Sequence, residues 1–145
     1  MIIDELKSHQ ETTKKVIDTM TEQLSIAANL CILTLKNKNK ILICGNGGSA
    51  ADAQHIATEL TGRYKTTRRG LSAIALSTDT SALTAIGNDF GFEYIFSRQI
   101  EALAQDGDLL IAISTSGNSP NIIEAIIEAK KQGCNILGMS GRDGG

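Results

Sequence analysis

The sequence contains no tryptophan, and aromatic residues make up only 3% of its 145 residues. It also has no excess of positive charge, because 14 basic side chains are balanced by 16 acidic ones, for a formal net charge of −2. A general nucleic-acid-binding domain is expected to be basic, and one that binds single strands stacks bases on aromatic rings. The composition therefore argues against nucleic acid as a partner.

Long apolar runs and paired cysteines are also missing. No apolar stretch approaches the roughly 20 residues that a membrane-spanning helix needs. The first seven residues, MIIDELK, do not show the basic and apolar segments of a secretory signal. The three cysteines, Cys31, Cys44 and Cys134, are widely spaced and odd in number. We therefore expect no membrane partner and no disulfide framework, and the cytoplasm as the compartment.

The length of 145 residues corresponds to one domain. Residues 2–36 carry apolar side chains at three- and four-residue steps, which predicts a long N-terminal helix. The apolar stripe of this helix must be covered, either by the domain itself or by another subunit.

Beyond this helix, short apolar runs alternate with helical patterns. The runs lie at 41–44, 71–76, 109–113 and 135–139, and the helical patterns at 49–60, 81–86, 92–104 and 120–132. We expect Ser49 to cap the first of these helices and Gly133 to end the last. Such alternation predicts an α/β fold, a three-layer open parallel sheet with helices on both faces, of the flavodoxin-like nucleotide-binding type.

Two loops follow predicted strands directly, at Gly45–Ser49 and Ser114–Ser119. In doubly wound sheets ligands bind at the carboxyl ends of the strands. The second loop offers the four hydroxyls of Ser114, Thr115, Ser116 and Ser119 beside a helix N-terminus, which can hold a phosphate without Lys or Arg. Turns and helix caps use the same residue types, but four hydroxyls within six residues favour an anion site.

The first loop also matches a dinucleotide-binding fingerprint, Gly45-x-Gly47-x-x-Ala50. That fingerprint needs an acidic residue at the end of the next strand, and the nearest candidate, Asp79, lies past it. A nicotinamide-dependent oxidoreductase is therefore disfavoured.

Two further pairs of polar residues have more than one interpretation. His55 and Glu59 are four residues apart, hence on one helical face, where they can transfer protons, supply two metal ligands or form a surface pair. A metal needs more ligands, and the only other histidine is His9. Asn88 and Asp89 can line the same cleft or cap the next helix.

Taken in order, these motifs resemble a known family. They are CGNGGS at 44–49, DAQH at 52–55, ELTGRY at 59–64, GNDFG at 87–91 and ISTSGNS at 113–119. The sequence resembles the phosphoheptose isomerases, which are sugar isomerase (SIS) domains, over nearly its whole length. Each motif alone is weakly specific, but the combination is highly specific.

The resemblance implies an aldose–ketose isomerase that converts sedoheptulose 7-phosphate to D-glycero-D-manno-heptose 7-phosphate through an enediol. This reaction begins the route to ADP-heptose and the lipopolysaccharide core. It further implies a homotetramer, and zinc bound through His55 and Glu59. The implied site consists of a phosphate-binding set, a sugar-lining set and a proton-transferring carboxylate: Ser114, Thr115, Ser116 and Ser119; Asn46, Gly47, Gly48, Asn88 and Asp89; and Glu59.

The sequence departs from the family in one respect. The family pattern includes a C-terminal helix with a catalytic His and a nearby Gln, and no residue here matches them. We therefore expect residues 1–145 to form a single SIS domain that lacks the family's last strand and helix, with the remaining zinc ligands outside this chain.

Two expectations about function follow from Glu59. It favours the isomerase over the alternative, a non-catalytic SIS module that binds sugar phosphates or scaffolds a replication-initiation complex. It is also expected to lie at the mouth of one strand, with the phosphate loop at another, so that the sugar stretches between them.

Overall fold

The computed structural model describes residues 1–145 and divides into two compact units, Met1–Ile32 and Leu33–Gly145. The first unit belongs to helix α1 (Ile2–Lys36), which confirms the long N-terminal helix. Within α1 only Thr34 is buried. Its exposed large apolar side chains include Ile2, Leu6, Ile17, Met20 and Leu24. None of the helices combines the length and the apolarity that spanning a bilayer requires.

The second unit is an α/β domain whose strands are all parallel. Its elements are β1 (Ile41–Gly45), α2 (Gly48–Thr61), β2 (Ala73–Ala75), α3 (Thr80–Asp89), the 3₁₀ helix η1 (Phe92–Tyr94), α4 (Ser97–Leu103), β3 (Leu109–Ser114), α5 (Pro120–Lys131) and β4 (Asn135–Ser140). The strand order is β2-β1-β3-β4. All four predicted strands are present, and the predicted open parallel sheet is confirmed.

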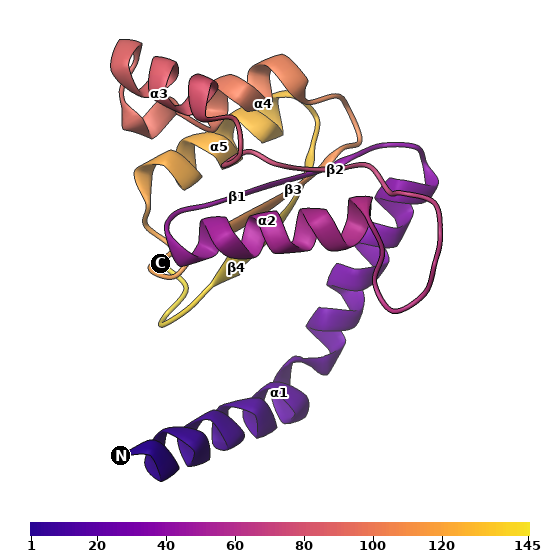
Figure 1. The fold of residues 1–145 in the computed structure, drawn as a ribbon, viewed down its shortest axis with the longest axis vertical. Helices are drawn as coiled ribbons and strands as arrows, with labels where there is room; N and C mark the ends of the chain where they lie inside the picture. The colour runs from indigo at the N-terminus through magenta and orange to yellow at the C-terminus, as the bar shows by residue number, and fades with distance from the viewer. The chain divides into compact units, whose positions relative to one another are not determined.

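Helices cover both faces of this sheet, with α2 on one side and α4 and α5 on the other (Figure 1). The two central strands, β1 and β3, are buried along their whole length, which is why they appear in the sequence as unbroken apolar runs. Towards α4 and α5, Leu42 and Leu110 pack with Phe96 and Ile100. Such burial of aliphatic and aromatic side chains is the main stabilising contribution to the domain.

Helix boundaries differ from the predictions in three places. Helix α2 begins at Gly48 with Gly47 as its N-cap residue, so the prediction of Ser49 as the cap was wrong. Gly47 has a φ of 54°, a left-handed conformation that glycine adopts without a steric cost and that turns the chain into the helix early. Helix α3 continues to Asp89 instead of ending at residue 86.

The third difference is that the helix predicted at 92–104 divides into η1 and α4. The amide of Tyr94 donates to the carbonyl of Gly91 and that of Ile95 to the carbonyl of Phe92, which is 3₁₀ spacing. Ile95 and Phe96, next in the chain, are buried in the core. Core packing at this point has therefore overridden the helical periodicity of the sequence.

A buried ion pair links the segments that enter the two central strands. Asp108, just before β3, is completely buried, and its carboxylate accepts hydrogen bonds from the amides of Lys40 (2.9 Å) and Gln105 (2.8 Å). The ammonium of Lys40, just before β1, lies 2.5 Å from the same carboxylate. The pair therefore holds the amino ends of β1 and β3 together, at the edge opposite the predicted site.

Candidate functional site

The two predicted loops meet at one edge of the sheet. Strands β1 and β3 are neighbours, with Gly45 at the end of β1 paired with Ile113 in β3. The chain proceeds from β1 to one side of the sheet and from β3 to the other, because the order is β2-β1-β3-β4. Their carboxyl ends thus form the switch point at which open parallel sheets bind ligands.

Glycine at position 45 allows helix α2 to begin very close to the end of β1. A Cβ atom at Gly45 would lie 2.6 Å from the backbone oxygen of Ser49, so no larger residue fits without a backbone shift. The amide of Ser49 donates to the carbonyl of Asn46 at 2.9 Å, which closes the turn. This loop therefore brings the positive end of α2 to the switch point.

The loop after β3, Ser114–Ser119, is called the hydroxyl loop here. The side chains of its first and last residues lie against each other. Ser114 is buried, and its Oγ lies 2.9 Å from the Oγ of Ser119. Ser119 is the N-cap residue of α5, yet its side chain makes no capping hydrogen bond. The Oγ of Ser116 accepts from the amide of Asn118 at 3.2 Å. The capping role that Ser residues usually have does not account for Ser119.

A pocket of about 180 Å³ lies between the two loops, and we call it the loop pocket. Its lining consists of polar side chains from both loops, one apolar residue and one arginine: Asn46, Ser49, Ile113, Ser114, Thr115, Ser116, Ser119 and Arg142. All four hydroxyls of the predicted phosphate loop are thus brought together beside the N-terminus of α5, as expected. The dipole of that helix favours an anion in the pocket.

Sequence reasoning missed Arg142. It lies in the turn after β4, where the amide of Gly141 donates to the carbonyl of Thr115 at 3.2 Å and so keeps that turn against the hydroxyl loop. The available signal was topological: β4 is parallel to β3, so the turn that follows it reaches the same edge. Arg142 gives the loop pocket a cationic side chain that the two loops do not contain.

Asn121 was also missed by the sequence reasoning. Its side chain is 2% exposed, and its amide pairs with that of Asn46 through two hydrogen bonds of 2.8 Å, one in each direction. The two residues come from opposite sides of the switch point. They also line a second hollow, of about 230 Å³, together with Phe92, Glu93, Ser119 and Pro120. Because Asn46 and Ser119 line both, this hollow adjoins the loop pocket.

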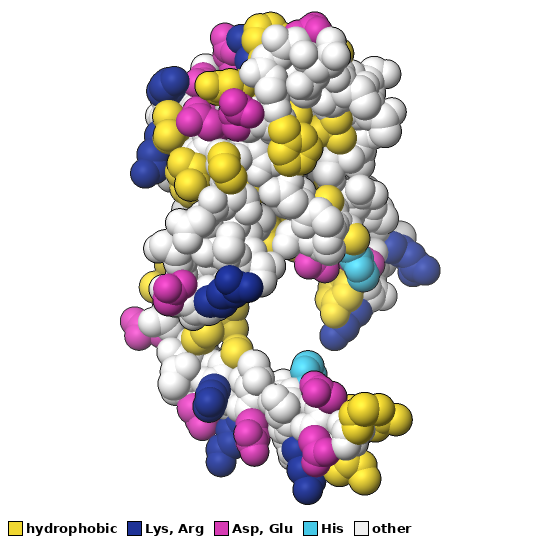
Figure 2. Space-filling view, turned by 90° about the vertical axis from the view of Figure 1, so that its left-hand side faces the viewer, with side chains coloured by type: hydrophobic (Ala, Val, Ile, Leu, Met, Phe, Trp, Pro, Cys, Tyr) yellow, Lys and Arg dark blue, Asp and Glu magenta, His cyan; other side chains and the backbone are white.

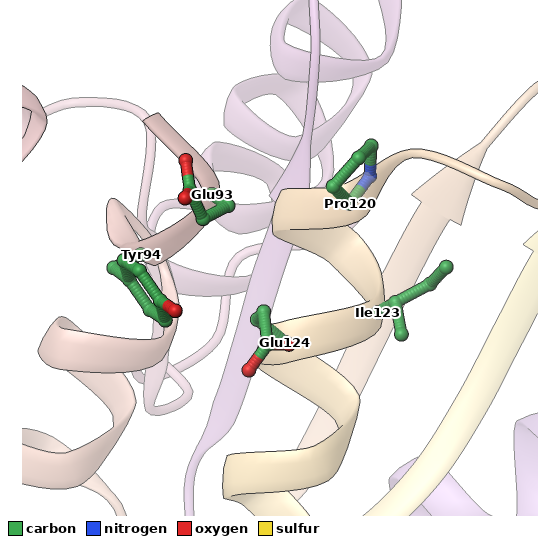
Figure 3. A pocket seen from close by; sticks show the side chains of 5 residues that line it. All are labelled: Glu93, Tyr94, Pro120, Ile123 and Glu124. Atoms are coloured by element: carbon green, nitrogen blue, oxygen red, sulfur yellow. The ribbon is translucent and has the colours of Figure 1, made fainter. Parts of the chain in front are cut away.

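A larger groove of about 540 Å³ lies between η1 and α5. Glu93 and Tyr94 line it from η1, and Pro120, Ile123 and Glu124 line it from α5 (Figure 3). Acidic and hydrophobic side chains also occur side by side on the surface of the second unit in Figure 2. Two carboxylates disfavour a bound phosphate, so the loop pocket is the better anion site.

Glu59 is not part of the loop pocket. His55 and Glu59 do share one face of α2, with 3.4 Å between Nε2 of His55 and Oε1 of Glu59, and both are solvent-accessible. Helix α2 runs away from the switch point (Figure 1). Ten residues of helix place Glu59 about 15 Å beyond Ser49, at 1.5 Å per residue. The expectation that Glu59 lies at the mouth of one strand, with the phosphate loop at another, was wrong, because the rise of helix α2 carries Glu59 away from the strand end.

Asn88 and Asp89 occupy the last two positions of α3 and are exposed. The amide Nδ2 of Asn88 donates to the carboxylate of Asp89 at 2.8 Å. Neither residue lines the loop pocket or the hollow beside it. Asp79, the candidate acidic residue of a dinucleotide site, accepts from the amide of Ala82 at 2.9 Å and caps α3.

His55 and Glu59 together offer two donor side chains for a metal ion. No group of three or more His, Cys, Asp or Glu side chains in the chain could hold a metal ion. A catalytic zinc needs three protein ligands and a structural zinc four. His55 and Glu59 therefore fit as part of a zinc site and do not complete one.

Comparisons with known proteins agree with this geometry. A SIS domain model matches residues 6–141. The phosphoheptose isomerase of Aliarcobacter butzleri is 66% identical over 144 residues, which cover 99% of this chain and 76% of that protein. The one of Campylobacter concisus is 63% identical, with coverages of 100% and 76%.

Solved structures give the same result. A phosphoheptose isomerase from Neisseria gonorrhoeae is 46% identical with a TM-score of 0.89, and the match covers 100% of this chain and 78% of that one. One from Francisella tularensis is 34% identical with a TM-score of 0.92, at the same coverages. The domain is thus of the SIS class, and its parallel sheet agrees with this assignment. Within that class, the chain belongs to the phosphoheptose isomerase family.

Proposed function

We propose that this protein is an aldose–ketose isomerase that interconverts sedoheptulose 7-phosphate and D-glycero-D-manno-heptose 7-phosphate. The observation that carries the proposal is the loop pocket, where four hydroxyls, an arginine and a helix N-terminus converge. The names of the relatives support the seven-carbon sugar phosphate as substrate. The product would enter the route to ADP-heptose and the lipopolysaccharide core.

In this proposal the substrate phosphate is bound by Ser114, Thr115, Ser116 and Ser119. Their hydroxyls donate to phosphate oxygens, and the α5 dipole adds a favourable field. Asn46, Gly47, Gly48, Asn88 and Asp89 form the sugar-lining set. The position of Asn46 in both the loop pocket and the adjoining hollow supports a path for the sugar from one to the other.

Glu59 is the proposed proton-transferring carboxylate. The carboxylate removes a proton from C1 of the ketose, and the C1–C2 enediol forms as the C2 carbonyl oxygen is protonated. The C1 hydroxyl then loses its proton as a proton is returned to C2, which leaves the aldehyde at C1 and a hydroxyl at C2. No atoms or electrons are gained or lost overall. The bound phosphate contributes by fixing the sugar, so that the reacting carbons meet the carboxylate in one orientation.

A homo-oligomer, in particular a tetramer, is proposed because one chain does not bring these groups together. Glu59 lies about 15 Å along α2 from the loop pocket, whereas seven carbons joined by bonds of about 1.5 Å span under about 10 Å. A second chain that supplies Glu59 to the loop pocket of the first removes this mismatch. The exposed apolar residues of α1 offer a surface for such assembly.

The proposal also includes zinc as the cofactor and the cytoplasm as the compartment. His55 and Glu59 would hold the ion with ligands from outside this chain, and the ion would polarise substrate oxygens as a Lewis acid. The cytoplasmic assignment is supported by three cysteines that form no disulfide.

The substitution Glu59→Gln tests the reaction. It preserves the shape of the side chain and removes the base, so turnover is expected to fall by at least about a hundredfold, while the Kd of sedoheptulose 7-phosphate stays measurable. Glu101→Gln is the matched control, because Glu101 is also a helical glutamate paired with a cationic residue, Arg98. Wild-type turnover in Glu59→Gln would refute the catalytic role of Glu59, whereas an absence of turnover in the wild-type protein would favour the non-catalytic SIS module.

Mixing two inactive variants tests the shared site. Ser116→Glu places a carboxylate in the loop pocket and is expected to abolish phosphate binding by charge repulsion. If Glu59 acts on a neighbouring chain, hetero-oligomers of Glu59→Gln and Ser116→Glu contain sites with both groups intact, and activity returns on mixing after dissociation and reassembly. Failure to recover activity in verified hetero-oligomers would rule out the shared site.

A further inference from the structure

The pair formed by Asn46 and Asn121 has features that the phosphate site does not explain. The two residues are 75 positions apart in the sequence, and their amides form a closed ring of two hydrogen bonds, each 2.8 Å long. Asn46 follows β1, whereas Asn121 lies in the first turn of α5 after β3. The ring therefore joins the two halves of the sheet directly above the switch point.

Helix α5 itself does not require an asparagine at position 121. The N-cap position is held by Ser119 and the first helical position by Pro120, whose ring suits that place. The Asn121 side chain is 2% exposed and is directed toward Asn46 instead of capping its own helix. A polar side chain so deeply buried is retained when its partner needs it, since an apolar residue would otherwise pack there at lower desolvation cost.

The pairing determines how Asn46 can meet a ligand. A primary amide has two N–H donors and two acceptor lone pairs, and the ring uses one of each. Asn46 thus keeps one N–H and one lone pair, in a plane fixed by Asn121. Asn46 lines both the loop pocket and the adjoining hollow, so its amide borders the space through which a sugar bound by its phosphate would extend.

We propose that Asn121 is a positioning residue for the isomerase: it holds the Asn46 amide in the orientation that binds the sugar hydroxyls, without contacting the phosphate. The inference rests on the proposed function, in which Asn46 lines the sugar site. It adds a role for a residue outside the hydroxyl loop, and it assigns the recognition of the sugar, rather than of the phosphate, to the paired amides.

A double-mutant cycle in this protein tests this role. Asn121→Ala is expected to raise the KM for sedoheptulose 7-phosphate about tenfold, as the loss of one or two buried hydrogen bonds would. Asn46→Ala is expected to raise it at least as much. Because Asn121 acts through Asn46, the double variant should be no worse than Asn46→Ala alone, which is strong non-additivity.

A second readout separates positioning from loss of structure. Inorganic phosphate, used as a competitive inhibitor, probes the hydroxyl loop alone, so its inhibition constant should change less than about twofold in Asn121→Ala. Asn121→Ser, which keeps a polar group but not the amide ring, should give the same pattern if Asn121→Ala folds poorly. Asn135→Ala is the control, because Asn135 is an exposed asparagine at the start of β4, at the opposite edge.

Three results would overturn the inference: an unchanged KM in Asn121→Ala and Asn121→Ser, losses that multiply in the double variant, or an inhibition constant that rises in parallel with KM. A wild-type protein without turnover would instead refute the proposed function. In that case the same cycle, measured as the Kd of sedoheptulose 7-phosphate, still decides whether Asn121 orients Asn46.

Discussion

Replacement of Asp108 by asparagine is expected to destabilise the domain without affecting its site. The Asp108 carboxylate is buried and accepts hydrogen bonds from the backbone amides of Lys40 and Gln105, besides the ion pair with the Lys40 side chain. The asparagine amide has the same shape, but its NH₂ group must face these donors. One of them then loses its acceptor, and the Lys40 ammonium loses its counter-ion.

The size of the effect follows from burial. Removing one partner of a buried ion pair costs about 3–5 kcal/mol. The Lys40 side chain is 17% exposed, so water partly compensates its charge and the lower end, about 3 kcal/mol, is expected. For a domain of this size, about 3 kcal/mol corresponds to a fall in Tm of roughly 6–12 °C. The kinetic constants at neutral pH should be unchanged, because the pair lies at the edge opposite the loop pocket.

The pH dependence identifies the charge as the cause. Burial raises the pKa of Asp108, but hydrogen bonds from the Lys40 backbone, the Lys40 side chain and the Gln105 backbone outweigh it, so the pKa lies below its ordinary value. The folded state therefore binds fewer protons than the unfolded state in acid. The stabilisation is complete above the unfolded pKa of about 3.9 and is lost as pH falls through the lower folded pKa.

Urea denaturation followed by circular dichroism measures these quantities, since the chain has no tryptophan for fluorescence. The difference in free energy of unfolding between wild type and Asp108→Asn should be largest near neutral pH and shrink below about pH 4. Asp106→Asn, an exposed aspartate two residues away, is the control. A difference that is under about 1 kcal/mol at pH 7, or that is the same at pH 7 and pH 3, would refute the reasoning.

Two further predictions concern the loops at the switch point. Gly45→Ala should lower the free energy of unfolding by about 1–3 kcal/mol, because its Cβ would lie 2.6 Å from the Ser49 carbonyl oxygen. Gly48→Ala is the control, since a Cβ there meets nothing within 4 Å. Urea denaturation measures both variants, and equal losses of stability would contradict the prediction. Arg142→Met should weaken sedoheptulose 7-phosphate binding about tenfold or more, as the loss of a charged hydrogen bond does. Arg98→Met is the control. Calorimetry measures the Kd, and an unchanged value would exclude Arg142 from the phosphate site.

The central fold could be predicted from the sequence because its signals are local and strong. The runs at 41–44 and 109–113 are apolar throughout, and each proves to be a strand buried on both faces. The run at 71–76 shortens to the edge strand β2, Ala73–Ala75. The break between η1 and α4 could not be predicted, since it depends on how Ile95 and Phe96 fit a core formed by distant residues.

The site was predictable only where its residues are consecutive. The hydroxyl loop is one stretch of six residues between a strand and a helix, so its chemistry is visible in the sequence. In the sequence, Asn121 is indistinguishable from an ordinary residue in the first turn of a helix. Its role becomes visible only with its partner Asn46, 75 positions away. Arg142 belongs to a turn sequence, and only the parallel pairing of β4 with β3 shows that this turn lies beside the hydroxyl loop. Both become informative only through the pairing of strands, which residue types alone do not specify.

Glu59, the proposed proton-transferring residue, lies far along α2 from the proposed phosphate-binding loop. A helix that follows a parallel strand places its first turn at the switch point and carries every later residue away by about 1.5 Å. Ser49, Ser119 and Asn121 therefore lie at the carboxyl ends of the strands of their own chain, and Glu59, near the end of α2, does not. In the proposed isomerase, one surface therefore binds the phosphate and another supplies the carboxylate. Loss of assembly should then abolish turnover while phosphate binding persists, which distinguishes it from damage to the hydroxyl loop.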